Sequence, residues 1–435
     1  MNDADVILIT CPPFWTRTPP LAMAVLKAYL ESLSYTVELF DLNAHFFHML
    51  KEYRPSWQRR DAVFEQDLFD KMICDYPEEM ERIIAHINNS SARYAGFSLF
   101  NRNLYFSIEL INKIVSSKQI IVGGPEVFYG SFGNFQNIHC LLTRNIEFFV
   151  IGEGESTLAD ILQGKAATVS TCIEVESLDN LPFYDFSDLF VPSEGVVLPL
   201  LASRGCIAHC AFCAERLLSK RYRQHSVGYM IGQIRHLMQM HRTSTFSFQD
   251  SLWNGNLSWC EEFCDAVISE GLAIHWDCQM LIRSGMDVAF FKKMKRAGCF
   301  NIFFGLESGS DTVLRLMKKP FRADEAGRVF TSAYQAGLHY EASLIIGYPG
   351  EGEQEFMETC SFLRHNRSVI KKIAQINPYI KLAPIRPNQP TEDPVRTQKR
   401  IRAILELLDS EGIRYTNAFI NNLVDHSDEL LALYE

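Results

Sequence analysis

Residues 198–213 read LPLLASRGCIAHCAFC, an apolar run that passes directly into three closely spaced cysteines. The apolar part, Leu198–Ala202, is typical of a buried parallel strand. Cys206, Cys210 and Cys213 follow it with the spacing C-x3-C-x2-C. Thiolates are soft ligands that suit iron–sulfur clusters, zinc or copper. The segment therefore predicts a metal-binding loop at the carboxyl end of a strand.

The spacing favours an iron–sulfur cluster over structural zinc. Zinc usually takes four ligands from paired short spacings, and no second C-x2-C pair follows Cys213. His209 stands between two of the cysteines, a crowded position for a fourth ligand. Three thiolates leave one iron of a cubane cluster open to a substrate. A zinc knuckle and a chance cluster of cysteines remain as alternatives.

The cysteine loop opens an alternating series of strands and helices. Helical stretches separate six apolar runs, which lie near residues 198–202, 246–248, 274–278, 302–304, 343–346 and 376–380. A full eight-fold barrel typically needs about 250 residues, so we expect a partial (β/α)6 barrel over residues 196–390. Residues 391–435 read as a helical tail.

The first half of the chain also alternates between strand and helix. Five short apolar runs, each followed by a turn, lie near residues 6–9, 37–40, 95–99, 120–122 and 148–151. This pattern predicts an α/β fold in residues 1–165, a doubly wound Rossmann-like or flavodoxin-like parallel sheet. Such sheets bind ligands beyond the carboxyl ends of their strands. We expect residues 166–195 to form a linker.

Composition restricts the class of protein. The chain has 435 residues, 47% of them hydrophobic and 22% charged, which is ordinary for a globular protein. Its net charge of −10 disfavours nucleic acid and anionic membranes as partners. The first residues lack the positive charge of a signal peptide, and no apolar run reaches the roughly 20 residues that span a bilayer. We therefore expect a soluble cytoplasmic protein.

The cysteine loop resembles that of the radical S-adenosylmethionine (SAM) superfamily, whose motif is C-x3-C-x-aromatic-C. Phe212 occupies the aromatic position. The resemblance implies that Cys206, Cys210 and Cys213 hold a [4Fe–4S] cluster whose open iron chelates SAM. One electron then cleaves the sulfonium, and the resulting 5′-deoxyadenosyl radical abstracts hydrogen from a substrate.

Four later segments, each at the end of a predicted strand, are similar to family segments. The resemblance implies SAM contacts from Phe212, Asp250, Arg283, Glu307, Ser308, Ser310, Ile346 and Gly347. Structural alternatives remain for several of these residues. Glu307 could pair with Lys318 or Lys319, Arg283 could be a solvated residue at a helix start, and Asp250 could be a helix N-cap. Gly347 could belong to a simple turn.

The first half resembles the cobalamin-binding domain of one radical SAM subfamily. The matching strand-end loops contain Pro12, Ser98, Gly123, Gly124 and Gly152. The D-x-H-x-x-G signature, whose histidine binds cobalt, is absent after the first strand. Bulky residues such as Phe100 and Phe128 could fill the corrin space or pack on the corrin. The sequence therefore leaves open whether cobalamin binds or the domain only supports the barrel and shapes the substrate pocket.

These observations predict an enzyme that contains a [4Fe–4S] cluster and uses SAM. With cobalamin, methylation of an unactivated carbon is expected; without it, radical dehydration, rearrangement or oxidation. We expect a small-molecule substrate and a reductase or flavodoxin-type electron donor, with no nucleic acid or membrane partner. The alternative is a regulatory protein that uses the same cysteines to hold zinc or a sensing cluster without turnover.

Overall fold

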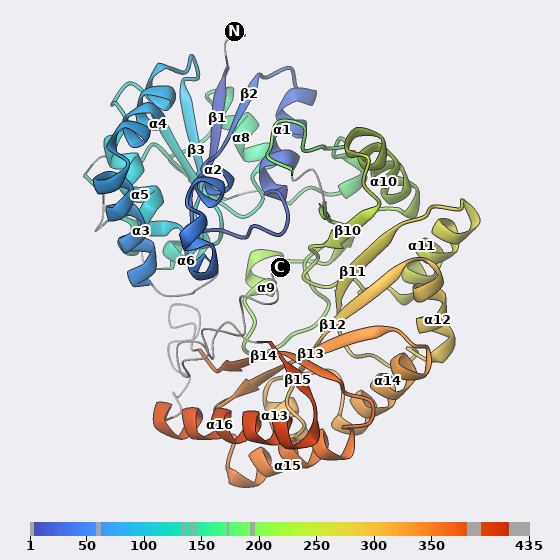
Figure 1. Cartoon of the computed structure of the whole chain (residues 1–435). Helices are drawn as coiled ribbons and strands as arrows, with labels where there is room; N and C mark the ends of the chain where they lie inside the picture. Colours follow the sequence, from blue (N-terminus) through green and yellow to red (C-terminus); the bar gives the residue numbers. More distant parts are fainter. Residues whose placement is uncertain are drawn as a thin grey trace. The chain divides into compact units, whose positions relative to one another are not determined.

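The computed structural model describes residues 4–57, 62–132, 135–139, 142–143, 146–171, 174–191, 196–380 and 393–416. The chain divides into two compact units. The first comprises Met1–Val196 with Gln233–Thr243, and the second comprises Val197–Gly232 with Ser244–Glu435. Each unit contains its own parallel sheet (Figure 1).

The sheet of the first unit has six parallel strands in the order β2-β1-β3-β4-β5-β6. The strands are β1 (Val6–Thr10), β2 (Val37–Asp41), β3 (Tyr94–Ser98), β4 (Gln119–Gly123), β5 (Phe148–Ile151) and β6 (Val169–Thr171). The five predicted strands and the doubly wound fold are confirmed. β6 was not predicted, because its three residues are largely exposed and carry no apolar run. It lies within the stretch that was expected to be a linker.

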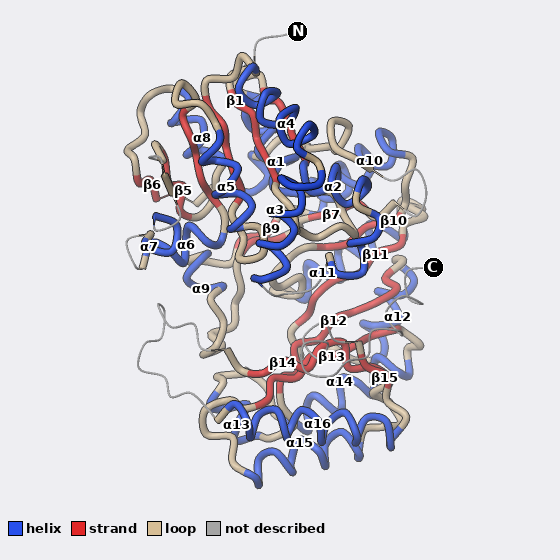
Figure 2. Tube along the Cα trace, turned by 60° about the vertical axis from the view of Figure 1, so that its left-hand side comes forward, coloured by secondary structure: helices blue, strands red, loops and turns tan. Residues whose placement is uncertain are grey.

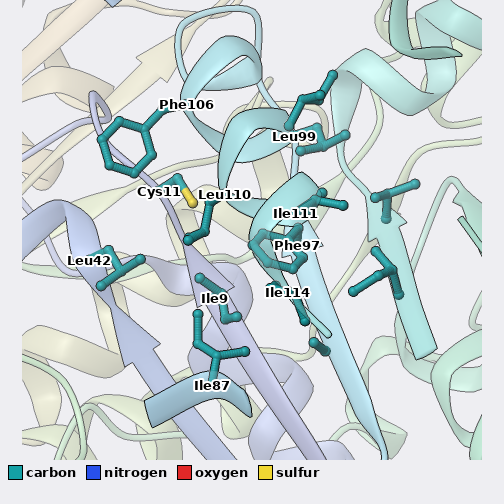
Figure 3. Close-up of a cluster of buried hydrophobic side chains, with 14 of the residues drawn as sticks. Ile9, Cys11, Leu42, Ile87, Phe97, Leu99, Phe106, Leu110, Ile111 and Ile114 are labelled. Atoms are coloured by element: carbon teal, nitrogen blue, oxygen red, sulfur yellow. The ribbon is translucent and has the colours of Figure 1, made fainter. Parts of the chain in front are cut away.

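Helices cover the first sheet because its strands are apolar on both faces. They are α1 (Leu21–Ser32), α2 (Leu42–Met49), η1 (Lys51–Ser56), α3 (Ala62–Asp75), α4 (Pro77–Asn89), α5 (Leu104–Lys113), α6 (Pro125–Ser131), α7 (Gln136–His139), α8 (Glu155–Leu162) and η2 (Leu178–Asn180). Figure 3 shows the core on one face, where Ile9 and Phe97 of the strands pack with Leu42, Phe106 and Leu110 of the helices.

The sheet of the second unit has seven parallel strands in the order β15-β14-β13-β12-β11-β10-β7. They are β7 (Leu198–Leu200), β10 (Thr245–Phe248), β11 (His275–Met280), β12 (Cys299–Glu307), β13 (His339–Ile346), β14 (Lys372–Pro378) and β15 (Arg414–Tyr415). The six predicted strands are confirmed. β8 (Ser203–Arg204) and β9 (Arg223–Gln224) form a separate antiparallel pair.

Helices of the second unit cover the outer face of its sheet (Figures 1 and 2). They are α11 (Leu257–Ser269), α12 (Val288–Arg296), α14 (Ala323–Gln335), α15 (Glu353–His365) and α16 (Pro394–Glu411). The unit also contains the short helices α9 (Glu215–Leu218) and α13 (Asp311–Leu316), while α10 (Val227–His241) belongs to the first unit from Gln233 on. Aromatic rings join both layers: Phe248 of β10 contacts Phe263 of α11, and Phe304 of β12 contacts Phe330 of α14.

The expected helical tail is confirmed over α16, and the described residues after it, 412–416, are not helical. Gly412 adopts the left-handed conformation, with φ of +67°, and ends the helix. Arg414–Tyr415 then pair with β14 as a strand, so the chain returns to the sheet. The rest of the predicted tail, 391–392 and 417–435, lies outside the described residues. Within the described parts of the chain, no helix is both long and apolar enough to cross a membrane.

The turn between α12 and β12 depends on Gly298, and this makes a stability test possible. A Cβ atom at Gly298 would lie 1.8 Å from the carbonyl oxygen of Ile274, whereas Gly271 has a similar left-handed conformation with open space around it. Gly271→Ala should therefore cost only backbone strain, about 1–2 kcal/mol. Gly298→Ala adds a backbone clash and should cost about 3 kcal/mol or more.

Urea unfolding followed by circular dichroism measures both variants. Because the chain has two units, the transition of the second unit is the one to compare. Equal losses of stability in the two variants would contradict the packing described at Gly298.

Candidate functional site

The cysteine loop is held at its base by a close approach between backbone segments. Gly205 has a φ of +85°, and a Cβ atom there would lie 2.5 Å from the carbonyl oxygen of Arg221. Only glycine fits such a contact. The β8–β9 pair thereby closes a hairpin-like loop, and Cys206 directly follows its base.

The three predicted ligands are half-buried, and the sulfurs of two of them accept backbone hydrogen bonds. The N–H of Ala208 donates to Sγ of Cys206 and the N–H of Glu215 donates to Sγ of Cys213, each at 3.4 Å. Burial raises the pKa of all three thiols, that of Cys206 to about 11. The thiolates that ligate iron therefore need a positive partner, which a bound metal supplies.

The donor chemistry of the loop fits an iron–sulfur cluster. Three thiols lie on one short loop, two of them with an N–H···S bond of the kind that stabilises cluster sulfurs. In the described part of the chain, no three His, Cys, Asp or Glu side chains converge closely enough to hold a single metal ion.

Phe212 anchors the loop to the helix that follows β12. Its ring packs against a small cluster built on Val313, Met317 and Tyr348. The N–H of Ala211 donates to the carbonyl oxygen of Met317 at 2.7 Å. The aromatic position of the motif thus fixes the loop that carries the cysteines.

Glu307, at the end of β12, is bound on both carboxylate oxygens. Lys319 Nζ lies 3.1 Å from Oε1 and also donates to the carbonyl oxygen of Gly305, while Ser343 Oγ donates to Oε2 at 2.9 Å. Lys319 also lies over the ring of Phe212, 5.4 Å from its centroid. The structural alternative of a pair with Lys319 is thus observed, and it joins Glu307 to the cysteine loop.

Ser308 and Ser310 are buried and point into the protein. Ser308 Oγ lies 3.0 Å from Thr359 Oγ1, and Ser310 Oγ donates to Glu358 Oε2 at 2.5 Å. Both partners belong to α15. These two side chains therefore fix the turn after β12 against a helix, and their hydroxyls are not directed at an open site.

Asp250 is also fully buried. It accepts hydrogen bonds from Ser203 Oγ at 2.5 Å and from the N–H of Ala202 at 3.1 Å. Burial raises its pKa to about 7. The structure thus places Asp250 as a support for the strand that leads into the cysteine loop.

Arg283 lies beside an open hollow next to the cysteine loop. Its Nη1 donates to the carbonyl oxygens of Asn254 and Gly255 at 2.6 and 2.9 Å. The hollow has a volume of about 340 Å³. Its lining comes from Ile207, Ala208, His209, Leu281, Ile282, Arg283, Ser284, Lys318, Pro320 and Glu325. Among the predicted SAM residues, Arg283 is the one that lines this hollow.

Ile346 and Gly347 end β13. Ile346 is fully buried, and the N–H of Gly347 donates to Glu351 Oε2 at 2.7 Å. Arg400 of α16 donates to the same carboxylate oxygen at 3.3 Å and to the carbonyl oxygen of Glu351 at 2.8 Å. Burial raises the pKa of Glu351. The turn is thus supported by a buried ion pair that sequence reasoning missed, because its partners are 49 residues apart.

The predicted cobalamin loops lie at neighbouring strand ends of the first unit. Ser98 and Gly123 end β3 and β4, and Gly124 and Gly152 follow β4 and β5. Gly152 is exposed and the other three are half-buried. Pro12, after β1, is buried. Gly124 is required by a close approach within the domain, since a Cβ atom there would lie 2.7 Å from the carbonyl oxygen of Leu99. Ser98, Gly123 and Gly152 place small residues at three adjacent strand ends.

Bulky side chains follow β1, β3 and β4, close in sequence to these small residues. The rings of Phe14 and Phe100 lie 4.5 Å apart, beyond β1 and β3. Phe128 contacts Tyr129 and Phe132. Asn103, fully buried, donates to the carbonyl oxygens of Cys11 and Ser98 and so joins the ends of β1 and β3.

The comparisons with known proteins identify the second unit. The family model described as the radical SAM superfamily matches residues 200–363. An uncharacterized methyltransferase of Pyrococcus horikoshii is 25% identical over 284 residues, covering 60% of this chain and 61% of that protein. The anaerobic magnesium-protoporphyrin IX monomethyl ester cyclase of Synechocystis is 24% identical over 316 residues, 65% of this chain and 60% of that protein. The chain thus spans about three fifths of these relatives.

Solved structures share the fold of nearly the whole chain. The radical SAM methyltransferase TsrM from Kitasatospora setae, with cobalamin and a [4Fe–4S] cluster bound, superimposes with a TM-score of 0.62 at 14% identity. It covers 86% of this chain and 75% of its own. The cobalamin-dependent radical SAM enzyme OxsB gives 0.58 at 18% identity, over 86% and 53%. Residues 200–363, which contain the C-x3-C-x-aromatic-C loop after the first strand of a partial barrel, thus form a radical SAM domain.

Proposed function

We propose that this protein is a cobalamin-dependent radical SAM methyltransferase that acts on a small molecule. The observation that carries the proposal is the loop of Cys206, Cys210 and Cys213, whose donor set fits a [4Fe–4S] cluster. When bound, the cluster supplies the electron that cleaves SAM, and cobalamin supplies a carrier for the methyl group. The relatives whose names record methyltransferases support this reaction.

The chain's own residues position the loop and bind the cofactors. The three cysteines ligate the cluster, and Phe212 fixes their loop through its contacts with Val313 and Met317. Arg283 stands in the hollow beside the loop, where its guanidinium can bind the carboxylate or ribose of SAM. Glu307 is positioned by Lys319 at the same end of the sheet.

Cobalamin would be held by the first unit at the ends of β3, β4 and β5. Ser98, Gly123, Gly124 and Gly152 provide small, accessible positions there. Without cobalamin, the same barrel would carry out a dehydration, rearrangement or oxidation. The relatives also include a magnesium-protoporphyrin IX monomethyl ester cyclase, whose name records a reaction other than methyl transfer. An external reductase or flavodoxin-type protein would supply electrons.

The first test removes one ligand of the cluster. Cys210→Ala should abolish the release of 5′-deoxyadenosine from SAM by anaerobically reconstituted, reduced protein, because two thiolates hold the cluster poorly. Cys74→Ala changes an exposed cysteine of α3 and should keep full activity. Wild-type protein that binds zinc, or binds iron without releasing 5′-deoxyadenosine, would support the regulatory alternative instead.

The second test concerns cobalamin. Protein purified with cobalamin supplied should show its visible absorption bands. Ser98→Trp should remove them, because a large side chain would occupy the end of β3. Ser116→Trp places the same side chain at an exposed position away from the strand ends and should leave binding intact. Colourless wild-type protein would favour a reaction without cobalamin.

The third test separates the structural role of Glu307 from contact with SAM. Lys319→Met leaves a buried carboxylate without its cation, and such a loss costs about 3–5 kcal/mol. Adding Glu307→Gln removes the unpaired charge and should recover most of the thermal stability. If Glu307 also binds SAM, the double variant will regain stability while its SAM affinity remains low. Recovery of both would assign Glu307 a structural role alone.

A further inference from the structure

In the described part of the chain, the helices that pack on the sheet of the second unit lie on one face of it, and the other face is here called the inner face (Figure 1). Successive side chains of a strand point to opposite faces of its sheet. Phe248 of β10 packs against a helix, so its neighbour Ser247 points to the inner face. Ser247 pairs in register with Asp277 of β11. Gln279 pairs with Phe303, and Phe303 pairs with Glu341. Polar residues therefore recur on this face in successive layers.

Accessible polar side chains are unusual on a parallel sheet, whose two faces are generally covered. Gln249, Gln279 and Gln375 are nevertheless exposed, and Asn377 is half-buried. Gln249 shares the inner face because its Nε2 donates to Ser247 Oγ at 3.1 Å. Gln375 shares it because it pairs in register with Ser343, whose hydroxyl binds Glu307. In an enzyme with a partial barrel, such a face is the place for a substrate.

The carboxylates of this face already have partners. Lys372 Nζ lies 2.7 Å from Glu341 Oε2, and Asn301 Nδ2 donates to the other oxygen at 3.4 Å. Glu307 is bound by Lys319. Asp277, buried one layer below the glutamines, accepts a hydrogen bond from Ser247 Oγ at 2.5 Å.

The exposed amides keep hydrogen-bonding capacity for a ligand. A carboxamide offers two donors and an oxygen with two lone pairs. Two hydrogen bonds, from Gln249 to Ser247 and from Asn377 Nδ2 to Gln375 Oε1 at 3.3 Å, use only part of that capacity. The face thus presents neutral donors and acceptors, and a charged group placed on it would lose water without gaining a counter-charge.

We propose that Gln249, Gln279 and Gln375 select an uncharged substrate through its amide or hydroxyl groups. This inference rests on the proposed function and names the substrate class of that site. β11 and β14 are three strand spacings apart, about 14 Å along the sheet. A substrate that reaches glutamines on both strands therefore carries hydrogen-bonding groups at both of its ends.

Three probes of similar length, extended enough to approach both strands, test the charge preference: neutral N-acetyl-triglycinamide, cationic triglycinamide and anionic N-acetyl-triglycine. Saturation-transfer NMR measures their binding to the full reconstituted chain. The neutral probe should bind best. Gln279→Leu and Gln375→Leu should each weaken its binding about two- to ten-fold, the usual effect of one lost hydrogen bond. Gln335→Leu, on the exposed surface of α14, should change nothing.

A charge-introducing variant adds a readout that a purely structural role would not move. Gln279→Glu keeps the shape of the side chain and should shift the preference to the cationic probe, triglycinamide. Stronger binding of a charged probe to the wild-type chain, no binding of the neutral probe, or equal binding in the Leu variants would overturn the inference. Because binding is measured apart from 5′-deoxyadenosine release, failure of this inference and failure of the proposed reaction are distinguishable.

Discussion

The ammonium group of Lys319 holds the centre of the second unit together. It lies between the carboxylate of Glu307, the carbonyl oxygen of Gly305 and the ring of Phe212. One cation thereby joins the end of β12 to the cysteine loop. Because both members of the ion pair are nearly buried, the interaction has the strength of a low-dielectric contact and tolerates the loss of neither partner.

This arrangement explains which parts of the site the sequence could predict. The cysteine spacing and its position after Leu198–Ala202 are local, so the loop and its strand were predicted correctly. The six apolar runs of the barrel were also local signals. β15 and β6 were missed because strands of two or three residues, with exposed side chains, give no periodic pattern.

The sequence did not predict hydrogen bonds and ion pairs between residues that are far apart in the chain. The hydroxyls of Ser308 and Ser310 bind Thr359 and Glu358, about 50 residues later, and the motif from which SAM contacts are predicted does not indicate these partners. Periodicity within one sequence cannot indicate which helix packs on a turn. Lys319 was found as an alternative because it lies near Glu307 in the chain, whereas the Glu351–Arg400 pair was not found at all.

The two edges of the barrel sheet bear on the behaviour of the protein at high concentration. One edge strand, β7, contains Pro199, which lacks an N–H group for a further ladder. The other, β15, has only two residues, one of them the charged Arg414. Short, interrupted or charged edges are poor templates for strand addition by another molecule. An open barrel thus avoids the self-association that its unclosed hydrogen-bond network would otherwise invite.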